Sequence, residues 1–491
     1  MAGQVKAAPT FALTPSSERT PTAQNYLTNA DFNWLNQYLP DTYEKEFERY
    51  GNRTISSFLR LVGAELPSNS DLVKWAEQGR LHTKYTKCTT AAANTAIEAD
   101  WTIPNNITNF NPALGGGSLA ALRVGQTVMI SDNTPGSTLS VKGIVKEAPS
   151  AGGLGVNVVK IAYYELTQQI AANAECDIFI YGSEFNKGTV GMQGSLEADD
   201  FIFSNKPIII KDKYSVSGSD MAQIGWIEVT TENGASGYLW YLKSEHETRL
   251  RFEDYLETAM IEAVPAVAGS GAGDFLQGTG AGLSAANLNG SDGIFFVVGQ
   301  RGNVYGGGNP QVLADFDNVI QRLDKQGAIE ENVIFLNRNF SFDIDDMLAA
   351  QNSYGAGGTS FGLFDNDEEM ALNLGFTGFR RGYDFYKTDW KYLNDPTMRG
   401  GLAAGTGSIN GLLVPAGSTS VYDQVLGKNA KRPFLHVRYR ASETEDRRYK
   451  TWITGSAGGA ATSSLDAMEV HFLSERCVCT LGANNFVLFE D

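Results

Sequence analysis

The strongest helical period of the sequence lies between Tyr241 and Ala263, and it constrains the fold more than any other segment. Apolar side chains recur there at i, i+3, i+4, i+7, i+8 and i+11, a spacing that places them on one stripe of an α-helix. A helix of this length extends about 30 Å at about 1.5 Å per residue. We therefore predict that one long amphipathic helix is the backbone of the fold. Its apolar stripe comprises Phe252, Tyr255, Leu256, Ala259, Met260 and Ala263.

The residues before position 84 predict an extended arm with short helices. Residues 1 to about 25 are rich in Pro, Thr, Ser and Gln, a composition typical of an extended segment. Capping residues and stop glycines predict helices at Thr42–Tyr50, Thr54–Val62 and Asp71–Gln78. Helices shorter than about 12–15 residues are marginal in water. These helices must therefore pack against another part of this chain or against another chain.

The sequence between about 100 and 183 changes to a β pattern. Runs of β-branched residues are separated by turn-forming pairs such as Pro135-Gly136 and Gly152-Gly153. This alternation predicts a small β-barrel or sandwich module. The predicted strands are Thr127–Ile130, Leu139–Val145, Val156–Ile161 and Ile178–Tyr181, followed in longer arms by Pro207–Ile210 and Trp226–Val229.

The segment after the long helix predicts an α/β part and then a return to strands. Residues 264–291 are rich in Gly, Ala and Ser and lack a period, which is typical of a functional or intersubunit loop. A helix is then expected with Asn309 as its cap, Pro310 at its first position and Gly327 as its stop. The other predicted elements are strand Ile294–Val298, strand Val333–Asn337, helix Ile344–Gln351, and the strands Leu435–Ala441, Tyr449–Thr454, Met468–Thr480 and Asn485–Phe489.

Length, charge and cysteine content narrow the class of protein. A chain of 491 residues exceeds what a single hydrophobic core supports, so about two to four sub-domains are expected. A net charge of −17 disfavours sequence-specific binding to nucleic-acid phosphates. The sequence shows no secretion signal and no apolar run near the roughly 20 residues of a membrane helix, so we expect a soluble protein that stays where it is made. Four cysteines are too few for a disulfide framework and favour a reducing compartment: Cys88, Cys176, Cys477 and Cys479.

One motif resembles a catalytic signature. Residues Gly358 to Gly362 match the G-x-S-x-G pattern of a nucleophile elbow, with Ser360 as the serine. The elbow needs a buried strand directly before the serine and a helix directly after it, whereas the preceding residues are polar and rich in glycine. In a chain with 53 glycines a chance match is expected. The sequence therefore favours a protein that is not an enzyme.

Two further clusters were weighed as metal or acid/base sites. The carboxylates Asp343, Asp345 and Asp346 are expected to cap a helix, since Asp residues favour helix N-termini. Cys477 and Cys479 with His471 form only half of a metal-ligand set, and buried cysteines on a strand are the commoner arrangement. The sequence predicts no metal and no cofactor.

The segment 431–450 is basic within an acidic chain. Such a segment is either a solvated ribbon or a surface that contacts an acidic neighbour through complementary charge. It holds three acidic residues and seven basic ones: Lys431, Arg432, Arg438, Arg440, Arg447, Arg448 and Lys450.

Taken in order, these segments resemble the major capsid proteins of tailed bacteriophages with the Hong Kong 97-type fold. The shared order is an N-terminal arm, a long β-loop, a long spine helix, a central α/β domain and return strands. Three stretches carry the resemblance: Asn205–Ser219, Glu245–Glu262, and the tail Ala461–Arg476 with Leu481–Phe486. The tail and the segment Phe58–Leu66 are most similar to the capsid proteins of crAss-like phages.

The resemblance implies an α+β fold of the Hong Kong 97 type with an inserted small β-barrel or sandwich module. Its implied parts are an N-terminal arm with short helices (1–83), an extended loop (84–231) with a β-rich insertion at about 100–183, a peripheral domain (232–290) with spine helix 241–263, an axial α/β domain (291–430), and return strands of the peripheral domain (431–491).

The implied function is that of a structural major capsid protein of the Caudoviricetes, which self-assembles as hexamers and pentamers into the icosahedral head around a double-stranded DNA genome. Its partners would be copies of itself, a scaffolding protein, the portal and decoration or auxiliary proteins. DNA would be only a non-specific neighbour, and no membrane is involved. The expected location is the virion, after assembly in the host bacterial cytoplasm. The expected assembly-interface residues are Lys206, Ile208, Ile210, Lys211, Arg432, Arg438, Arg440, Arg447 and Arg448.

Two alternatives stay open beside this function. The β-rich half of the chain alone would suit another virion protein, such as a decoration or tail protein. A serine hydrolase that uses Ser360 is the second alternative.

Overall fold

The computed structural model describes residues 64–79, 82, 84–90, 97–104, 121–135, 137–149, 157–166, 170–171, 173–194, 200–222, 229–230, 236–237, 240–267, 270–272, 290–327, 329–351, 378–402, 408–423, 428–457 and 461–491. Two compact units are present. The first contains 209–258 and 446–474, and the second contains the described residues of 58–208, 259–445 and 475–491. The boundaries expected from the resemblance stay predictions. Among the described helices, none has the length and apolar character needed to cross a membrane.

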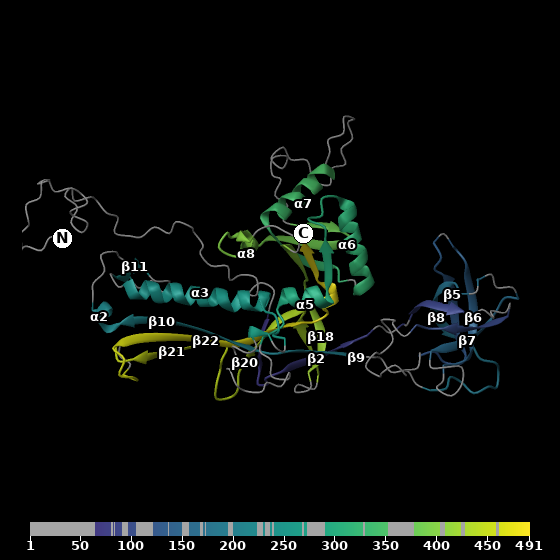
Figure 1. Ribbon diagram of the computed structural model, residues 1–491, viewed down its shortest axis with the longest axis horizontal. Helices are drawn as coiled ribbons and strands as arrows, with labels where there is room; N and C mark the ends of the chain where they lie inside the picture. Colours follow the sequence, from purple (N-terminus) through teal and green to yellow (C-terminus); the bar gives the residue numbers. More distant parts are fainter. Residues whose placement is uncertain are drawn as a thin grey trace, which may run out of the picture. The chain divides into compact units, whose positions relative to one another are not determined.

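The predicted long helix is confirmed as α3, Trp240–Glu262, and it organises the first unit. Figure 1 shows α3 running along β10 (Ile208–Ser217) and β22 (Ala467–Thr480). Phe252 and Leu256 pack against apolar side chains of β22, and the rings of Phe252 and Phe472 lie 5.7 Å apart. The buried face differs from the predicted stripe, because Tyr255 is 44% exposed whereas Glu257 and Ile261 are buried.

Strand β22 is long, and its two halves have different neighbours. Its first half pairs antiparallel with β21 (Lys450–Gly455). Its second half pairs antiparallel with β20 (Leu435–Arg440), which pairs in parallel with β1 (Ala64–Ser68). The predicted strands of this region are thereby confirmed.

The second unit contains a mixed six-stranded sheet. Its strand order is β13-β23-β17-β14-β16-β15, with parallel pairs β13/β23 and β14/β16 and antiparallel pairs elsewhere. The C-terminal strand β23 therefore lies inside the sheet. The strands are β13 (Asn303–Gly306), β14 (Glu331–Leu336), β15 (Gly378–Arg381), β16 (Tyr383–Asp389), β17 (Ile409–Pro415) and β23 (Val487–Glu490).

Helices cover both faces of the mixed sheet. On one face, α6 (Leu313–Gln326) and α7 (Arg338–Gln351) bury their apolar stripes against Ile334 and Leu336. On the other face, Phe335 meets Trp390, which lies 5.9 Å from Phe295 of α5 between ring centroids. Successive strand residues point to opposite faces, so the continuous apolar run of β14 serves both layers. The elements of the second face are α5 (Ile294–Arg301) and α8 (Lys391–Asn394), and the unit also contains the short 3₁₀ helices η4 (Arg399–Gly401) and η5 (Ala483–Asn485).

The predicted β-module is confirmed as a closed six-stranded barrel with the order β3-β4-β7-β6-β5-β8. It begins earlier than expected, since its first strand starts at Lys84 rather than near residue 100. The ring of Trp101 is fully buried in the barrel core, and its Nε1 donates to the Tyr163 hydroxyl at 3.2 Å. The barrel strands are β3 (Lys84–Thr90), β4 (Glu98–Thr102), β5 (Gln126–Asp132), β6 (Ser140–Glu147), β7 (Val158–Tyr163) and β8 (Glu175–Ser183).

The helix predicted at Asp71–Gln78 is wrong. Residues Val73–Gln78 form strand β2, which pairs antiparallel with β9 (Asp200–Asn205) in a two-stranded ribbon. A helix of two turns has little stability of its own, whereas every residue of Val73–Gln78 has a pairing partner on β9. One face of the ribbon is held by Arg301, whose guanidinium lies 4.0 Å from the ring centroid of Phe203.

The strand predicted at Ile294–Val298 is also wrong, because these residues form helix α5. A short, wholly apolar run does not distinguish a buried strand from a buried helix by its period. Gly293, directly before the helix, packs so closely on the backbone of Ala263 that a Cβ atom would lie 2.6 Å from it. The tertiary contact therefore overrides the β preference of the run.

The remaining predictions are partly confirmed. Helix α6 ends before Gly327 as expected but begins at Leu313, and helix α7 begins six residues before the expected Ile344. The predicted helices before residue 63 and most of Trp226–Val229 lie outside the described residues. Further short elements are α2 (Gly218–Met221), the pair β11 (Val229–Thr230) with β12 (Ser236–Gly237), and the hairpin β18 (Ser418–Asp423) with β19 (Lys428–Pro433).

Candidate functional site

Strands β10, β22 and β21 present a second face opposite α3, which we name the open sheet face. Met468, Val470 and Phe472 point to α3, so the intervening residues of β22 point away from it. The same alternation along β10 leaves Ile209, with 53% exposure, on the open sheet face. The open sheet face comprises Ile209, Lys211 and Lys213 of β10, Glu469 and His471 of β22, and Lys450, Trp452 and Thr454 of β21.

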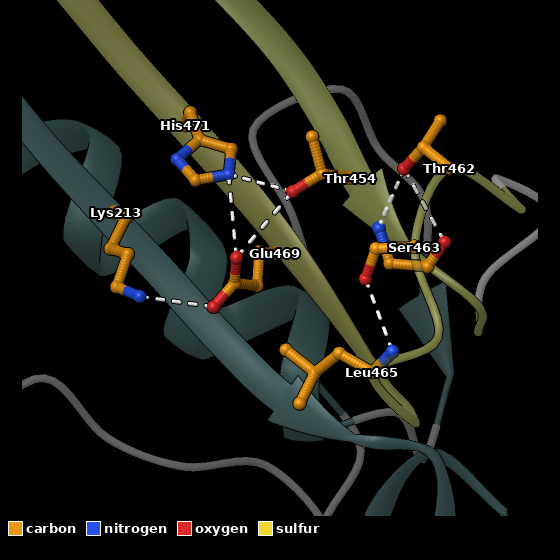
Figure 2. A network of polar contacts seen from close by, with 8 residues as sticks. Lys213, Thr454, Thr462, Ser463, Leu465, Glu469 and His471 are labelled. Atoms are coloured by element: carbon orange, nitrogen blue, oxygen red, sulfur yellow. Dashed lines mark hydrogen bonds and ion pairs between the residues drawn. The ribbon is translucent and has the colours of Figure 1, made fainter.

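A polar network crosses the three strands (Figure 2). Lys213 Nζ donates to Glu469 Oε1 at 2.9 Å. The second carboxylate oxygen of Glu469 lies 3.6 Å from His471 Nε2, which is 2.8 Å from the Thr454 hydroxyl. These contacts connect the sheet across its width and fix the position of the imidazole.

Electrostatics keeps Glu469 ionised in this network. The hydrogen bond from the Lys213 ammonium, with the positive charge that it carries, lowers the pKa of Glu469 below its usual value. The Lys213 side chain is 59% exposed and that of Glu469 is 18% exposed. Solvent screens such a pair, so its role is to orient side chains rather than to supply much stability.

Aromatic stacking extends the network to the edge of the sheet. The rings of Trp452 and His471 stack with centroids 5.1 Å apart and an interplanar angle of 14°. Lys450 Nζ lies 6.0 Å from the centroid of the Trp452 ring. The indole is still 36% exposed. An exposed aromatic ring between oriented charged groups is typical of a protein contact surface.

Strand β21 ends at Gly455, where the connection to β22 begins. Gly455 has a φ of 125°, and a Cβ atom there would lie 1.9 Å from the carbonyl oxygen of Ala467. The Gly455 amide donates to the Thr462 hydroxyl at 2.9 Å, and the Ser463 hydroxyl accepts from the Leu465 amide at 3.1 Å (Figure 2). These contacts lie at the end of the β21/β22 pair, next to the position where Thr454 is opposite Glu469.

Replacing Gly455 by alanine is expected to lower the free energy of unfolding by about 2 kcal/mol or more, because the new Cβ atom meets backbone in a φ region that L residues rarely adopt. Chemical denaturation followed by tryptophan fluorescence measures the change. Gly191→Ala is the matched control, since nothing lies within 4 Å of its Cβ position. Equal stability of both variants would contradict the requirement for glycine at position 455.

The four predicted interface residues between positions 206 and 211 have different surroundings. Lys211 is exposed on the open sheet face. Ile210 is half-buried and packs against the core under α3, because alternation along β10 turns it inward. Its place at an interface stays a prediction. Ile208 is half-buried at the start of β10. The backbone amide of Lys206 donates to the Asn205 side chain at 2.7 Å.

The predicted arginines lie in several places. Arg438 donates to the carbonyl oxygen of Pro67 at 3.3 Å. Arg440 forms ion pairs with Asp71 and, at 3.5 Å, with Glu475. These two side chains thus contact their own chain, which the sequence did not predict.

The other three predicted arginines are Arg432, Arg447 and Arg448. Arg448 is exposed, and its carbonyl oxygen accepts from the Ser474 hydroxyl at 2.6 Å. Arg447 is half-buried, and the side chain of Arg432, in β19, lies outside the described residues. Contact of any of these arginines with an acidic neighbour stays a prediction.

The candidate catalytic and metal residues have different outcomes. Ser360 and its motif lie outside the described residues. Asp343 and Asp345 were expected as helix caps, but α7 begins at Arg338, so this expectation is wrong. Asp343 instead accepts from Asn309 at 2.6 Å, and Asp345 pairs with Lys387.

The cysteines are buried, as expected. Cys477 and Cys479 are at most 1% exposed on β22, and the residue opposite Cys479 is His436 of β20. The hydrogen bond with the Cys479 thiol and burial raise the pKa of Cys477. Within the part of the chain that the structure describes, no three His, Cys, Asp or Glu side chains are grouped so that they could hold a metal ion.

Comparison with solved structures gives similarities at low sequence identity. No family model matches the sequence, and no curated protein matches it. A solved structure from Mycobacterium phage Ogopogo is similar with a TM-score of 0.40 at 10% identity, covering 95% of this chain and 99% of that chain. One from Microbacterium phage Oxtober96 gives 0.37 at 11% identity, with 94% and 98% covered. The mature capsid of bacteriophage PhiM1 gives 0.32 at 10% identity, with 63% and 78% covered. TM-scores below 0.5 do not establish a common fold, and no function of this chain follows from them.

Proposed function

We propose that this chain is the major capsid protein of a tailed bacteriophage with a Hong Kong 97-type fold, related most closely to those of crAss-like phages. The observation that carries the proposal is the order of its elements. A long β excursion (β2 to β10) precedes the long helix α3, then come a mixed sheet with helices and finally the return strands β22 and β23. This is the order on which the sequence resemblance rests, and the side-chain contacts described above support each part of it.

The ribbon of β2 and β9 supports a role in assembly. It contains only two strands, and Ile202 on it is 72% exposed. A two-stranded ribbon is marginally stable in water, and its outer edges offer unpaired backbone groups. In a closed lattice the ribbon of each copy would pack against a neighbouring copy. The same weak contact, repeated over the whole lattice, would then give a stable shell.

The open sheet face is the second surface proposed for assembly. It combines an exposed tryptophan with the exposed apolar side chain of Ile209 and an exposed cation at Lys211. Aromatic residues are enriched in protein interfaces and carry much of the binding energy there. In the proposed shell this face contacts a neighbouring subunit within the hexamers and pentamers, and the exposed arginine Arg448 contributes charge at the rim.

The proposed partners follow from the same function. A scaffolding protein would guide assembly in the bacterial cytoplasm, and the portal and decoration or auxiliary proteins would join the shell of the virion. The double-stranded genome is enclosed without specific contacts, which suits a chain with a net charge of −17. The closed barrel alone would also suit a decoration or tail protein, but the helices on both faces of the mixed sheet favour the shell subunit.

Expression of the full chain with a candidate scaffolding protein is expected to give rings or closed shells under negative-stain electron microscopy. Ile209→Asp places a charge on the open sheet face and should leave soluble, folded subunits that do not assemble. Leu166→Asp is the control, because Leu166 is 84% exposed on a barrel loop and lies outside the proposed contact. Ser360→Ala should assemble normally.

Three results would count against the proposal. A discrete monomer at high concentration with scaffolding protein present would favour a decoration or tail protein. An esterase activity that disappears in Ser360→Ala would favour the hydrolase. Normal assembly of Ile209→Asp would remove the open sheet face from the contact.

A further inference from the structure

The first and last strands of the barrel bring two of the four cysteines together. Cys88 of β3 and Cys176 of β8 are directly opposite each other in the antiparallel register. Both side chains are fully buried in the barrel core. The pair therefore lies at the place where the barrel closes.

The register of the pair is compatible with a covalent bond. Directly opposite residues of antiparallel strands have Cα atoms about 4.5–5.5 Å apart, and disulfides join Cα atoms about 4.4–6.8 Å apart. The backbone is locally irregular here, since the register shifts between Tyr85 and Cys88 and Lys87 has a φ of 55°. Such a bulge bends the strand and increases its local twist.

The other two cysteines provide an internal contrast. Cys477 and Cys479 lie two residues apart on the same strand. The two thiols are hydrogen-bonded to each other, but residues two apart on a strand keep their Cβ atoms about 6.6 Å apart at a rise of about 3.3 Å per residue. A disulfide needs a Cβ separation of about 3.5–4.5 Å. Strand geometry thus permits a bond in the barrel and forbids one between Cys477 and Cys479.

We propose that Cys88 and Cys176 are an oxidative modification site at which a small disulfide oxidant, such as glutathione disulfide, joins β3 to β8. One cysteine, as its thiolate, attacks the oxidant to form a mixed disulfide and releases one glutathione thiol. The second cysteine then attacks the protein sulfur of that mixed disulfide and releases the second glutathione. The two cysteines lose two hydrogens and two electrons, and one glutathione disulfide becomes two glutathione thiols.

Burial determines when this reaction occurs. Loss of solvation raises the pKa values of both Cys88 and Cys176 to about 12, so both remain protonated in the closed barrel. The thiolate is the reactive form, and a buried thiol reacts slowly. Oxidation therefore requires β3 and β8 to separate transiently, and the disulfide is shielded from reductants once the barrel closes again. The disulfide thus forms only when the barrel opens, and it then links β3 to β8 covalently. This inference does not depend on whether the chain builds a shell.

The full chain incubated with excess glutathione disulfide tests this proposal, in native buffer and in urea below the unfolding transition. Free thiols are then alkylated, and non-reduced peptides are analysed by mass spectrometry. We expect a peptide in which Cys88 is linked to Cys176, with Cys477 and Cys479 alkylated. Urea should accelerate the reaction several-fold, since it raises the population of the open barrel.

Alanine variants identify the bond. Cys88→Ala and Cys176→Ala should each lose the linked peptide, whereas Cys477→Ala should retain it. Oxidation should also raise the melting temperature of the wild-type chain, and reductant should reverse this shift after unfolding, but neither effect should occur in Cys88→Ala. The proposal is overturned if both barrel cysteines are alkylated in the urea arm, if glutathione stays attached to either one, or if the bond joins two chains.

Discussion

Replacing Leu256 by aspartate is expected to remove the folded subunit. Leu256 is 6% exposed and packs with Phe252 on the core beneath α3. A carboxylate there would be buried without a partner, and such changes cost about 4 kcal/mol or more. Since domains are stable by about 5–15 kcal/mol, most or all of the stability of this unit would be lost. The measurements are soluble yield, circular dichroism and the midpoint of denaturation by urea.

The neighbouring residue is a matched control for this variant. Tyr255 lies on the same helix and is 44% exposed, so Tyr255→Asp introduces the same charge into solvent. We expect this variant to fold with nearly wild-type stability. If Leu256→Asp also folds normally, α3 does not have the central role that we give it.

Replacing Phe489 by alanine is expected to lower the free energy of unfolding by about 3–5 kcal/mol. Phe489 is fully buried on β23, and its ring lies 5.0 Å from Phe340 and 5.9 Å from Tyr305 between centroids. Alanine would leave a cavity between the mixed sheet and its helices that the neighbours fill only in part. Chemical denaturation measures the change, and hydrogen exchange would show the loss of protection in β13 and β17.

The control for Phe489 removes a ring of the same size from the surface. Phe342 lies on α7 and is 55% exposed, so Phe342→Ala should change the stability by less than about 1 kcal/mol. Similar losses in the two variants would show that β23 is not a central strand of this sheet.

The sequence predicts two kinds of element well. In one kind the pairing partners lie nearby in the sequence, and in the other the periodic pattern extends over many residues. The helix at Trp240–Glu262 follows from its own stripe, and four barrel strands follow from β-branched runs between turn residues. The two wrong predictions, at Asp71–Gln78 and Ile294–Val298, depend on distant partners. The first segment pairs with β9, and the second packs beside Ala263. Local patterns do not contain this information.

The same reason limits prediction of the candidate site. Lys211 is exposed, as an interface residue must be. The pair of Lys213 and Glu469 was missed because the two residues are 256 positions apart in the sequence. Trp452 and His471 stack only through the pairing of β21 with β22. The alternation of polar and apolar residues along β22 was the signal that could have placed Glu469 and His471 on one face.

The late position of β22 and β23 has a consequence for biosynthesis. Strand β22 supplies partners to β20 and β21, and β23 lies between β13 and β17. The ribosome makes residues 467–490 after all of these partners, so neither sheet can be completed before these residues have been made. Contacts of such long sequence separation fold slowly. Chains made only as far as residue 466 would therefore lack a strand in each of these sheets.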